Sequence, residues 1–131
     1  MTNIPKDLRY TRDHEWIRID GTSGVMGITD YAQHAMGDIV YVELPEVGRQ
    51  VKAGEDFIVV ESVKGANDVF SPVSGKVAEV NEDLDGAPEL LNEDCYANWI
   101  ARVDLSDPAD LEALMDPTAY AEYCLQAEAE D

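Results

Sequence analysis

Lysine is scarce in this chain, and one lysine stands between two runs of strand-forming residues. Lys64 follows "FIVVESV" and precedes "GANDVF", and both flanks favour β-structure. A lysine at a turn would present a nucleophilic amine on a flexible stem, which is the usual substrate for acylation. Lys64 is therefore a candidate modification site, weighed against the fact that most lysines are simply solvated. The other lysines, Lys6, Lys52 and Lys76, lie in ordinary polar surroundings.

Other patterns that could do chemistry are weak. "GTSGVMG" is followed by strand-like residues and lacks the lysine of a phosphate-binding loop. His14 and His34 have no third ligand at a metal-binding spacing, so each fits a surface or capping role better than a metal site. The "DHE" at residues 13–15 could be an acid–base cluster, and a turn entering a strand explains it equally well. No catalytic constellation emerges.

Composition narrows the class of protein. The chain has 131 residues, of which 45% are hydrophobic, so we expect one domain with a core of its own. A net charge of −19 argues against binding nucleic acid or anionic membranes, because both need a basic patch. The acidic residues serve solubility first; a salt-adapted host would also favour them, and they could steer the protein toward basic partners.

Compartment and redox state follow from similar observations. No apolar run approaches the length that spans a bilayer, and "MTNIPKDLRY" resembles no export leader. We therefore expect a cytoplasmic protein. Cys95 and Cys124 form no C-x-x-C motif and no metal spacing with the histidines, which favours reduced thiols over a disulfide.

The elements that would position Lys64 are mostly short strands. Alternation in "EWIRID" predicts a half-buried strand with Trp16 on one side and Ile17 and Ile19 on the other, and residues 15–28 read as a hairpin. Further strand patterns appear in "DIVYVEL", "GRQV", "FIVVESV", "DVF", "GKVAEVN" and "WIARV", separated by glycine and proline turns. Many short strands of this kind predict a barrel or a sandwich.

Helices are expected at three places. Residues 29–36 form one short helix, with Thr29 or Asp30 as its cap, Gly37 at its end, and Ala32, Ala35 and Met36 on its packed face. "SDPADLEALMD" and "DPTAYAEYCLQAEAE" each place proline after a capping aspartate and predict C-terminal helices. The whole chain, 1–131, then reads as one domain with a core over about 8–105 and helices over about 107–127.

The residues around Lys64 predict a β-hairpin. "VKGAN" joins two strand patterns, and Gly65 and Asn67 tolerate the left-handed backbone angles that a chain reversal uses. A side chain at such a tip points into water and is held by the sheet beneath it. The sequence thus predicts that Lys64 is exposed and accessible from many directions.

Several segments together resemble one known family. "YTRDHEWIRIDG", "GITDYAQHAMGDIVYVELPEVG", "ESVKGANDVFSPVSGKVAEVN" and "APELLNED" are similar, in the same order, to H proteins of the glycine cleavage system, a lipoyl-carrier family. The resemblance runs from about Leu8 to Tyr123. Several long motifs in register are more specific than any one alone.

The resemblance implies a fold and a function. Lys64, in "ESVKG", would be linked to lipoic acid through an amide, at a hairpin tip of a flattened barrel of two sheets. The protein would be a carrier and not an enzyme. Its arm would take an aminomethyl group from a pyridoxal-phosphate glycine decarboxylase, present it to a tetrahydrofolate-dependent aminomethyltransferase, and be reoxidised by a flavin-dependent dihydrolipoyl dehydrogenase.

Three further residues are expected near this site. Glu15 of "HEW" and Asp68 of "NDV" match family motif positions that could line a cleft for the loaded arm. Glu61 lies on the approach to the hairpin tip, where we expect it to help recognition by the lipoate-attaching enzyme. The chain departs from the family pattern at Gly65, which is usually Ala, and at "CYANW", which is one residue shorter than the common P-Y-x-x-G-W.

Three alternatives remain open on the sequence. An H-like protein could relay lipoyl groups to other acceptors instead of carrying aminomethyl. A biotin carrier shares the hairpin-lysine design, but biotin acceptors resemble "MKM", whereas Val63 and Gly65 flank Lys64 here. An unmodified interaction module would use only the acidic surface.

Overall fold

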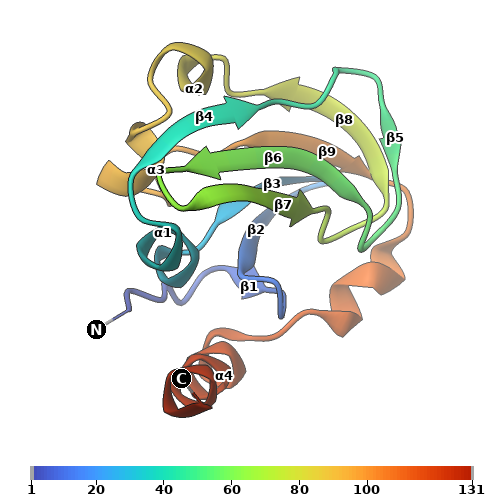
Figure 1. The fold of residues 1–131 in the computed structure, drawn as a ribbon. Helices are drawn as coiled ribbons and strands as arrows, with labels where there is room; N and C mark the ends of the chain where they lie inside the picture. The colour runs from blue at the N-terminus through green and yellow to red at the C-terminus, as the bar shows by residue number, and fades with distance from the viewer. Residues whose placement is uncertain (1, 131) are drawn as a thin grey trace.

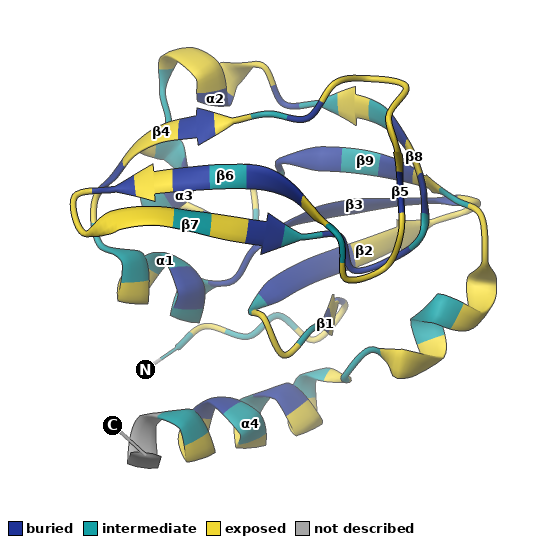
Figure 2. Cartoon of the chain, turned by 45° about the vertical axis from the view of Figure 1, so that its right-hand side comes forward, coloured by how far each residue is buried: buried dark blue, intermediate teal, exposed yellow. Residues whose placement is uncertain are grey.

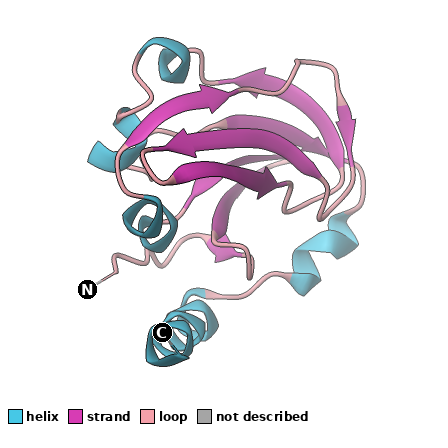
Figure 3. Ribbon diagram, viewed as in Figure 1, coloured by secondary structure: helices cyan, strands magenta, loops and turns pink. Residues whose placement is uncertain are grey.

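Two antiparallel β-sheets pack face to face in the computed structural model, which describes residues 2–130 (Figure 1). The large sheet has the order β1-β2-β3-β9-β8-β5, with β1 Arg9–Tyr10, β2 Glu15–Asp20, β3 Ser23–Ile28, β9 Ala101–Leu105, β8 Gly75–Val80 and β5 Gln50–Val51. The small sheet has the order β4-β6-β7, with β4 Ile39–Glu43, β6 Asp56–Ser62 and β7 Gly65–Phe70. The prediction of a mainly β, two-sheet fold is confirmed, with helices at the periphery (Figure 3).

The main core lies between the two sheets. Ile17 and Val103 from the large sheet and Val60 and Val69 from the small sheet are each at most 1% exposed and belong to one cluster. Inward residues on each strand alternate with outward ones, which is how a sandwich fills its interior. This packed core supports the small sheet and therefore the hairpin that carries Lys64.

β2 differs from the predicted half-buried strand. Trp16 and Ile17 are both fully buried although they point to opposite faces, whereas Ile19 is 37% exposed. α4 (Pro117–Glu130) explains the difference, because its Tyr120 and Cys124 pack with Trp16 in a second cluster on the outer face of the large sheet. The helix covers only the first half of β2, so the far half stays in solvent (Figure 2).

The first helix forms where the sequence predicts it. α1 spans Asp30–Met36, the Thr29 hydroxyl accepts a hydrogen bond from the Ala32 backbone N–H at 3.2 Å, and Gly37 follows with φ 77°. The predicted packed face is only partly correct, because Ala32 is buried but Ala35 is exposed. Ala35 instead faces the region near the β6–β7 hairpin, as described below.

The remaining helices complete the periphery. The two predicted C-terminal helices are present, although the first, η1 (Pro108–Ala113), is a 3-10 helix. Two four-residue helices, α2 (Asp83–Gly86) and α3 (Leu90–Glu93), were not predicted, because one helical turn is too short to show a periodicity. Within residues 2–130 no helix is both long and apolar enough to cross a membrane.

Candidate functional site

The β6–β7 hairpin reverses through Val63 and Lys64. Ser62 pairs with Gly65, so only two residues form the turn, and Gly65 adopts φ 141°. The Ser62 hydroxyl accepts a hydrogen bond from the Lys64 backbone N–H at 3.2 Å. Asn67 does not belong to the turn, contrary to the prediction: it lies within β7 opposite Val60, and its side-chain amide donates to the Gly65 carbonyl at 3.3 Å.

The Lys64 side chain is exposed and lies against the end of α1. Its Nζ donates to the carbonyl oxygen of Ala35 at 3.3 Å. A cation is favoured there because unpaired carbonyls give a helix C-terminus partial negative charge. The contact is a single exposed hydrogen bond, so it holds the lysine only weakly.

A hollow of about 510 Å³ opens beside Lys64. It lies between α1, β7 and the loop before β2. Ala35 and Met36 form part of one wall, and Ala66 and Asp68 form part of another. The hollow is therefore lined by both apolar and acidic groups and is continuous with the exposed amine.

Of the two predicted cleft residues, only Asp68 lines this hollow. Glu15 lies behind the lining and is 2% exposed, with Oε1 accepting from the Thr11 hydroxyl at 2.6 Å and Oε2 accepting from the Phe70 backbone N–H at 3.2 Å. Burial raises the pKa of Glu15 to about 7, although both hydrogen bonds oppose that rise. Glu15 thus connects the large sheet to the end of β7 and adjoins two residues of the lining, His14 in sequence and Phe70 through its hydrogen bond.

His14, for which the sequence favoured a surface or capping role, lines the hollow. It is the one non-glycine residue with positive φ in the described chain, at 67°, and its ring stacks on Tyr31 with centroids 4.3 Å apart. Its Nδ1 lies 2.8 Å from the Tyr120 hydroxyl, which lies 2.7 Å from the Thr29 hydroxyl. Burial lowers the pKa of His14, and the nearby Asp13 carboxylate opposes this shift.

This network joins α4 to the start of α1 and to the loop before β2. Thr29 is fully buried, and its hydroxyl accepts from the Ala32 N–H while it also lies within hydrogen-bond distance of the Tyr120 hydroxyl. The Tyr120 hydroxyl is therefore shared between Thr29 and His14 Nδ1. No local motif could have indicated this arrangement, because Tyr120 is 106 residues away from His14.

The other predicted residues lie apart from the hollow. Glu61 is exposed on β6, opposite Tyr41 on one side and Ala66 on the other. Cys95 and Cys124 are both buried and no disulfide joins them, as expected. Among the described residues, no group of three or more histidine, cysteine or carboxylate side chains is arranged to hold a metal ion.

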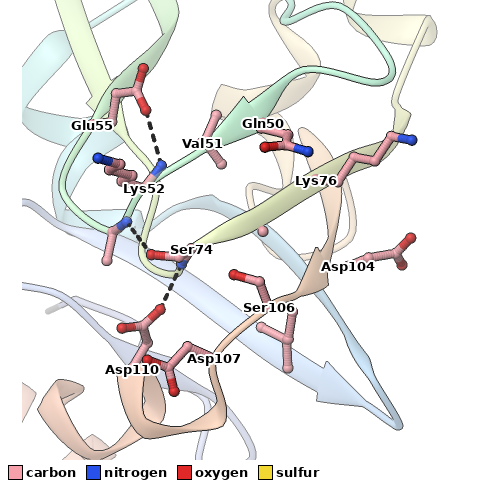
Figure 4. A pocket seen from close by; sticks show the side chains of 13 residues that line it. Gln50, Val51, Lys52, Glu55, Ser74, Lys76, Asp104, Ser106, Asp107 and Asp110 are labelled. Atoms are coloured by element: carbon pink, nitrogen blue, oxygen red, sulfur yellow. Dashed lines mark hydrogen bonds between the residues drawn. The ribbon is translucent and has the colours of Figure 1, made fainter.

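A larger hollow, of about 910 Å³, lies near the other end of β6 (Figure 4). Its polar groups bond to one another: the Ala53 N–H donates to the Ser74 hydroxyl at 2.9 Å, and the Ser74 N–H donates to Asp110 Oδ2 at 2.8 Å. These bonds tie the 52–55 turn and η1 to the start of β8. Since Lys64 lies at the opposite end of the strand, this hollow has no part in the site around it.

Comparisons with known proteins agree with this geometry. Residues 8–127 match the family model described as glycine cleavage H-protein. The glycine cleavage system H protein of Alkaliphilus oremlandii is 60% identical over 117 residues, covering 89% of this chain and 92% of that protein. That of Carboxydothermus hydrogenoformans is 52% identical over 131 residues, covering 99% and 100%. The crystal structure of a glycine cleavage system H protein from Mycobacterium marinum superposes with a TM-score of 0.84 at 40% identity, covering 91% and 97%.

Proposed function

Since this chain belongs to the glycine cleavage H-protein family, we propose that it serves the glycine cleavage system as its lipoyl carrier and that Lys64 holds the lipoyl group. The observation that carries the assignment of Lys64 is its place on an exposed two-residue turn directly beside a hollow of about 510 Å³. Lys6, Lys52 and Lys76 do not border that hollow.

The surroundings of Lys64 fit the attached group. The amine is accessible to an attaching enzyme, and its one bond, to the Ala35 carbonyl, is exposed and easily broken. In the attachment, the amine attacks the carbonyl of a lipoyl group activated as an acyl adenylate. A C–N bond forms, the bond from the acyl carbon to the phosphate oxygen breaks, AMP leaves with the electron pair, and the nitrogen loses a proton. The product is neutral, so the charge-assisted bond to α1 is lost.

When bound, the lipoyl group supplies a disulfide that accepts the aminomethyl unit of glycine and is later restored from the dithiol. The chain's own residues supply position and shelter. Ala35, Met36 and Ala66 offer apolar walls, and the Asp68 carboxylate offers a partner for a cationic amine. Glu15 lies beneath the lining of the hollow and accepts a hydrogen bond from the Phe70 N–H at the end of β7. This bond helps to hold in place the strand to which Asp68 belongs.

In this role the protein carries a group between enzymes and catalyses no step itself. Its partners are the pyridoxal-phosphate decarboxylase, the aminomethyltransferase, the dihydrolipoyl dehydrogenase and the lipoate-attaching enzyme, all in the cytoplasm. A tethered group raises its effective concentration at each partner without tight binding. The high negative charge, −19, suits brief encounters with basic surfaces.

An intact-mass measurement tests the proposal. The protein and a Lys64→Arg variant are each incubated with a lipoate-attaching enzyme, lipoate and ATP, with Lys76→Arg as the matched control. We expect a mass gain of one lipoyl amide in the wild type and in the control, and none in Lys64→Arg. An unshifted wild type, or a shifted Lys64→Arg variant, contradicts the assignment. Loaded protein that supports no glycine decarboxylation would point to a lipoyl relay instead.

A further inference from the structure

A β-bulge shapes the outer face of the small sheet next to the hairpin tip. Ile39 pairs with Ser62 and Tyr41 pairs with Glu61, so Val40 is an extra residue without a partner of its own. Ile39 and Val42 are 3% and 2% exposed, whereas Val40 and Tyr41 between them are 56% and 45% exposed. The bulge thus turns two consecutive apolar side chains toward solvent, where regular alternation would bury one of them.

These two side chains adjoin the Lys64 hairpin. Tyr41 lies directly opposite Glu61, and the Val63 N–H donates to the Asp38 carbonyl at 2.9 Å, which places Val63 beside the start of β4. Val63 is 67% exposed. Val40 and Tyr41 are consecutive, Tyr41 lies opposite Glu61, and Val63 follows Glu61 by two residues, so these four exposed residues lie together at this end of the small sheet. Figure 2 shows exposed segments of β4, β7 and the tip gathered at this end of the sheet.

Exposed large hydrophobic residues are concentrated at this surface. The described chain has six large hydrophobic residues that are exposed, and three of them are Val40, Tyr41 and Val63. The other three are apart from one another: Ile19 is on β2, Val47 is in the loop between β4 and β5, and Leu125 is on α4. Single exposed apolar residues are ordinary, but a group of them beside a functional residue marks an interaction site.

We propose that this surface, formed by Val40, Tyr41, Glu61 and Val63, is where the lipoate-attaching enzyme docks in order to acylate Lys64. The inference rests on the proposed function and goes beyond it by assigning the contact. An enzyme that forms the amide must bring its activated carbonyl to within about 3.5 Å of Nζ, so its surface must cover the residues that flank the lysine. The other partners react with the far end of the lipoyl arm, so the attaching enzyme is the one whose reacting atoms must reach Nζ itself.

Charge specifies the chemistry of the partner. The charged side chains beside this surface, at the end of β6 and in the turn before β4, are carboxylates, namely Glu61 and Asp38. The matching surface is therefore an apolar depression with a rim of arginine or lysine. On this chain, Tyr41 is the residue expected to insert into that depression, because tyrosine supplies a large contact area at a small cost in side-chain entropy.

Loading kinetics test the inference. Val40→Thr combined with Tyr41→Ser keeps a β-branched residue at the bulge and removes the apolar contact, and Val47→Thr, at a site 62% exposed, is the matched control. We expect kcat/KM for lipoylation to fall about tenfold or more in the double variant, mainly through KM, and less than twofold in the control. Val63→Thr should fall severalfold, and raised salt should slow the wild type.

If the wild type is not loaded at Lys64, both the proposed function and this inference are wrong. If the wild type is loaded and the double variant and Val63→Thr load as fast as Val47→Thr, the inference alone is wrong. A double variant that unfolds in urea at a lower midpoint leaves the decision to Val63→Thr and to the salt dependence.

Two other occupants of the surface are separated by parallel measurements. If sedimentation shows a dimer that the double variant disperses, the surface joins two copies of this chain and the inference is overturned. The double variant is also loaded to completion and assayed with the glycine decarboxylase. A loss there as large as the loss in loading would assign the surface to that enzyme instead.

Discussion

The tip of the β6–β7 hairpin and the seam between α4 and β2 are built in opposite ways. At the seam Trp16 and Tyr120 are fully buried; Trp16 Nε1 donates to the Cys95 carbonyl at 3.1 Å, and Tyr120 stacks on Tyr10 with centroids 4.4 Å apart. At the tip Lys64 is exposed and its side chain makes one hydrogen bond. The contacts that stabilise the fold are thus concentrated in the seam, whereas the residue proposed to be modified contributes little to stability.

The largest effect on stability is expected from Tyr120→Ala. The substitution removes a fully buried ring from the seam and should lower the free energy of unfolding by about 4 kcal/mol. Urea unfolding measures the loss. The lipoylation rate of the fraction that stays folded should remain within twofold of wild type, because the seam lies away from Lys64; a tenfold slower rate would mean that the two regions are coupled.

Glu15 is expected to make stability depend on pH. Its pKa is about 7 in the folded protein, above its ordinary value of 4.5, so the folded state holds the proton more tightly than the unfolded state. The contribution is fully present below about pH 4.5 and is lost as pH rises to about 7, a difference of about 3 kcal/mol.

Urea unfolding of wild type and Glu15→Gln from pH 4.5 to 8 checks this expectation. The free energy of unfolding of Glu15→Gln should lack this part of the pH dependence. Any stability that the variant loses because one hydrogen bond is left unpaired should be the same at every pH in the range. If the difference between the two proteins does not change with pH, Glu15 is ionised in the fold. His14 is present in both proteins and has the opposite effect on stability. Because its pKa is lowered in the folded state, the free energy of unfolding falls as the pH drops below 6.5.

Tyr120→Phe sharpens the account of the seam by keeping the ring and removing the hydroxyl. His14 Nδ1 and the buried Thr29 hydroxyl then lose their shared partner, so we expect a loss of about 2 kcal/mol. Urea unfolding gives the loss, and the imidazole nitrogen shifts in NMR should change because His14 Nδ1 has lost its hydrogen-bond partner. If Tyr120→Phe leaves the free energy of unfolding unchanged, a water molecule replaces the lost hydroxyl.

Gly37→Ala tests the link between α1 and the tip. Gly37 has φ 77° and ψ −155°, a conformation nearly restricted to glycine, so alanine should cost about 1 kcal/mol or somewhat more. Thermal unfolding measures this, with Gly86→Ala, where an added Cβ meets nothing within 4 Å, as the control. Equal midpoints in the two variants would show that the helix end adapts.

Lys64→Arg is expected to have the smallest effect on stability and the largest on function. The exposed side chain keeps its charge, so the free energy of unfolding should stay within about 0.5 kcal/mol of wild type. Intact mass should show no lipoylation. A clear loss of stability would contradict the contrast between tip and seam, because the single bond to Ala35 would then matter to the fold.

Local patterns were enough to predict the elements that present Lys64. The Thr29 cap and Gly37 delimit α1, and the two strand patterns around Lys64 predict the hairpin, because capping, positive φ and alternation depend on neighbours in sequence. The resemblance to H proteins, borne out by the family match, then gave Lys64 its proposed role.

Only the tertiary structure decided the environment around these elements. Asn67 was placed in the turn by its type, but the register of β7 puts it inside the strand. Trp16 is buried because α4 folds back over β2, and Glu15 is buried because the end of β7, 55 residues away, covers it. The exposure of Val40 depends on a bulge that appears only when β4 pairs with β6.

The sequence by itself thus determined which residue could react and that it would stand at a hairpin tip. Tertiary structure decided what surrounds it: the hollow, the hydrogen bond between His14 and Tyr120, the pKa of Glu15 and the apolar surface at Val40 and Tyr41. The physical reason is distance along the chain, because burial and electrostatics sum over neighbours in space that no short sequence window contains.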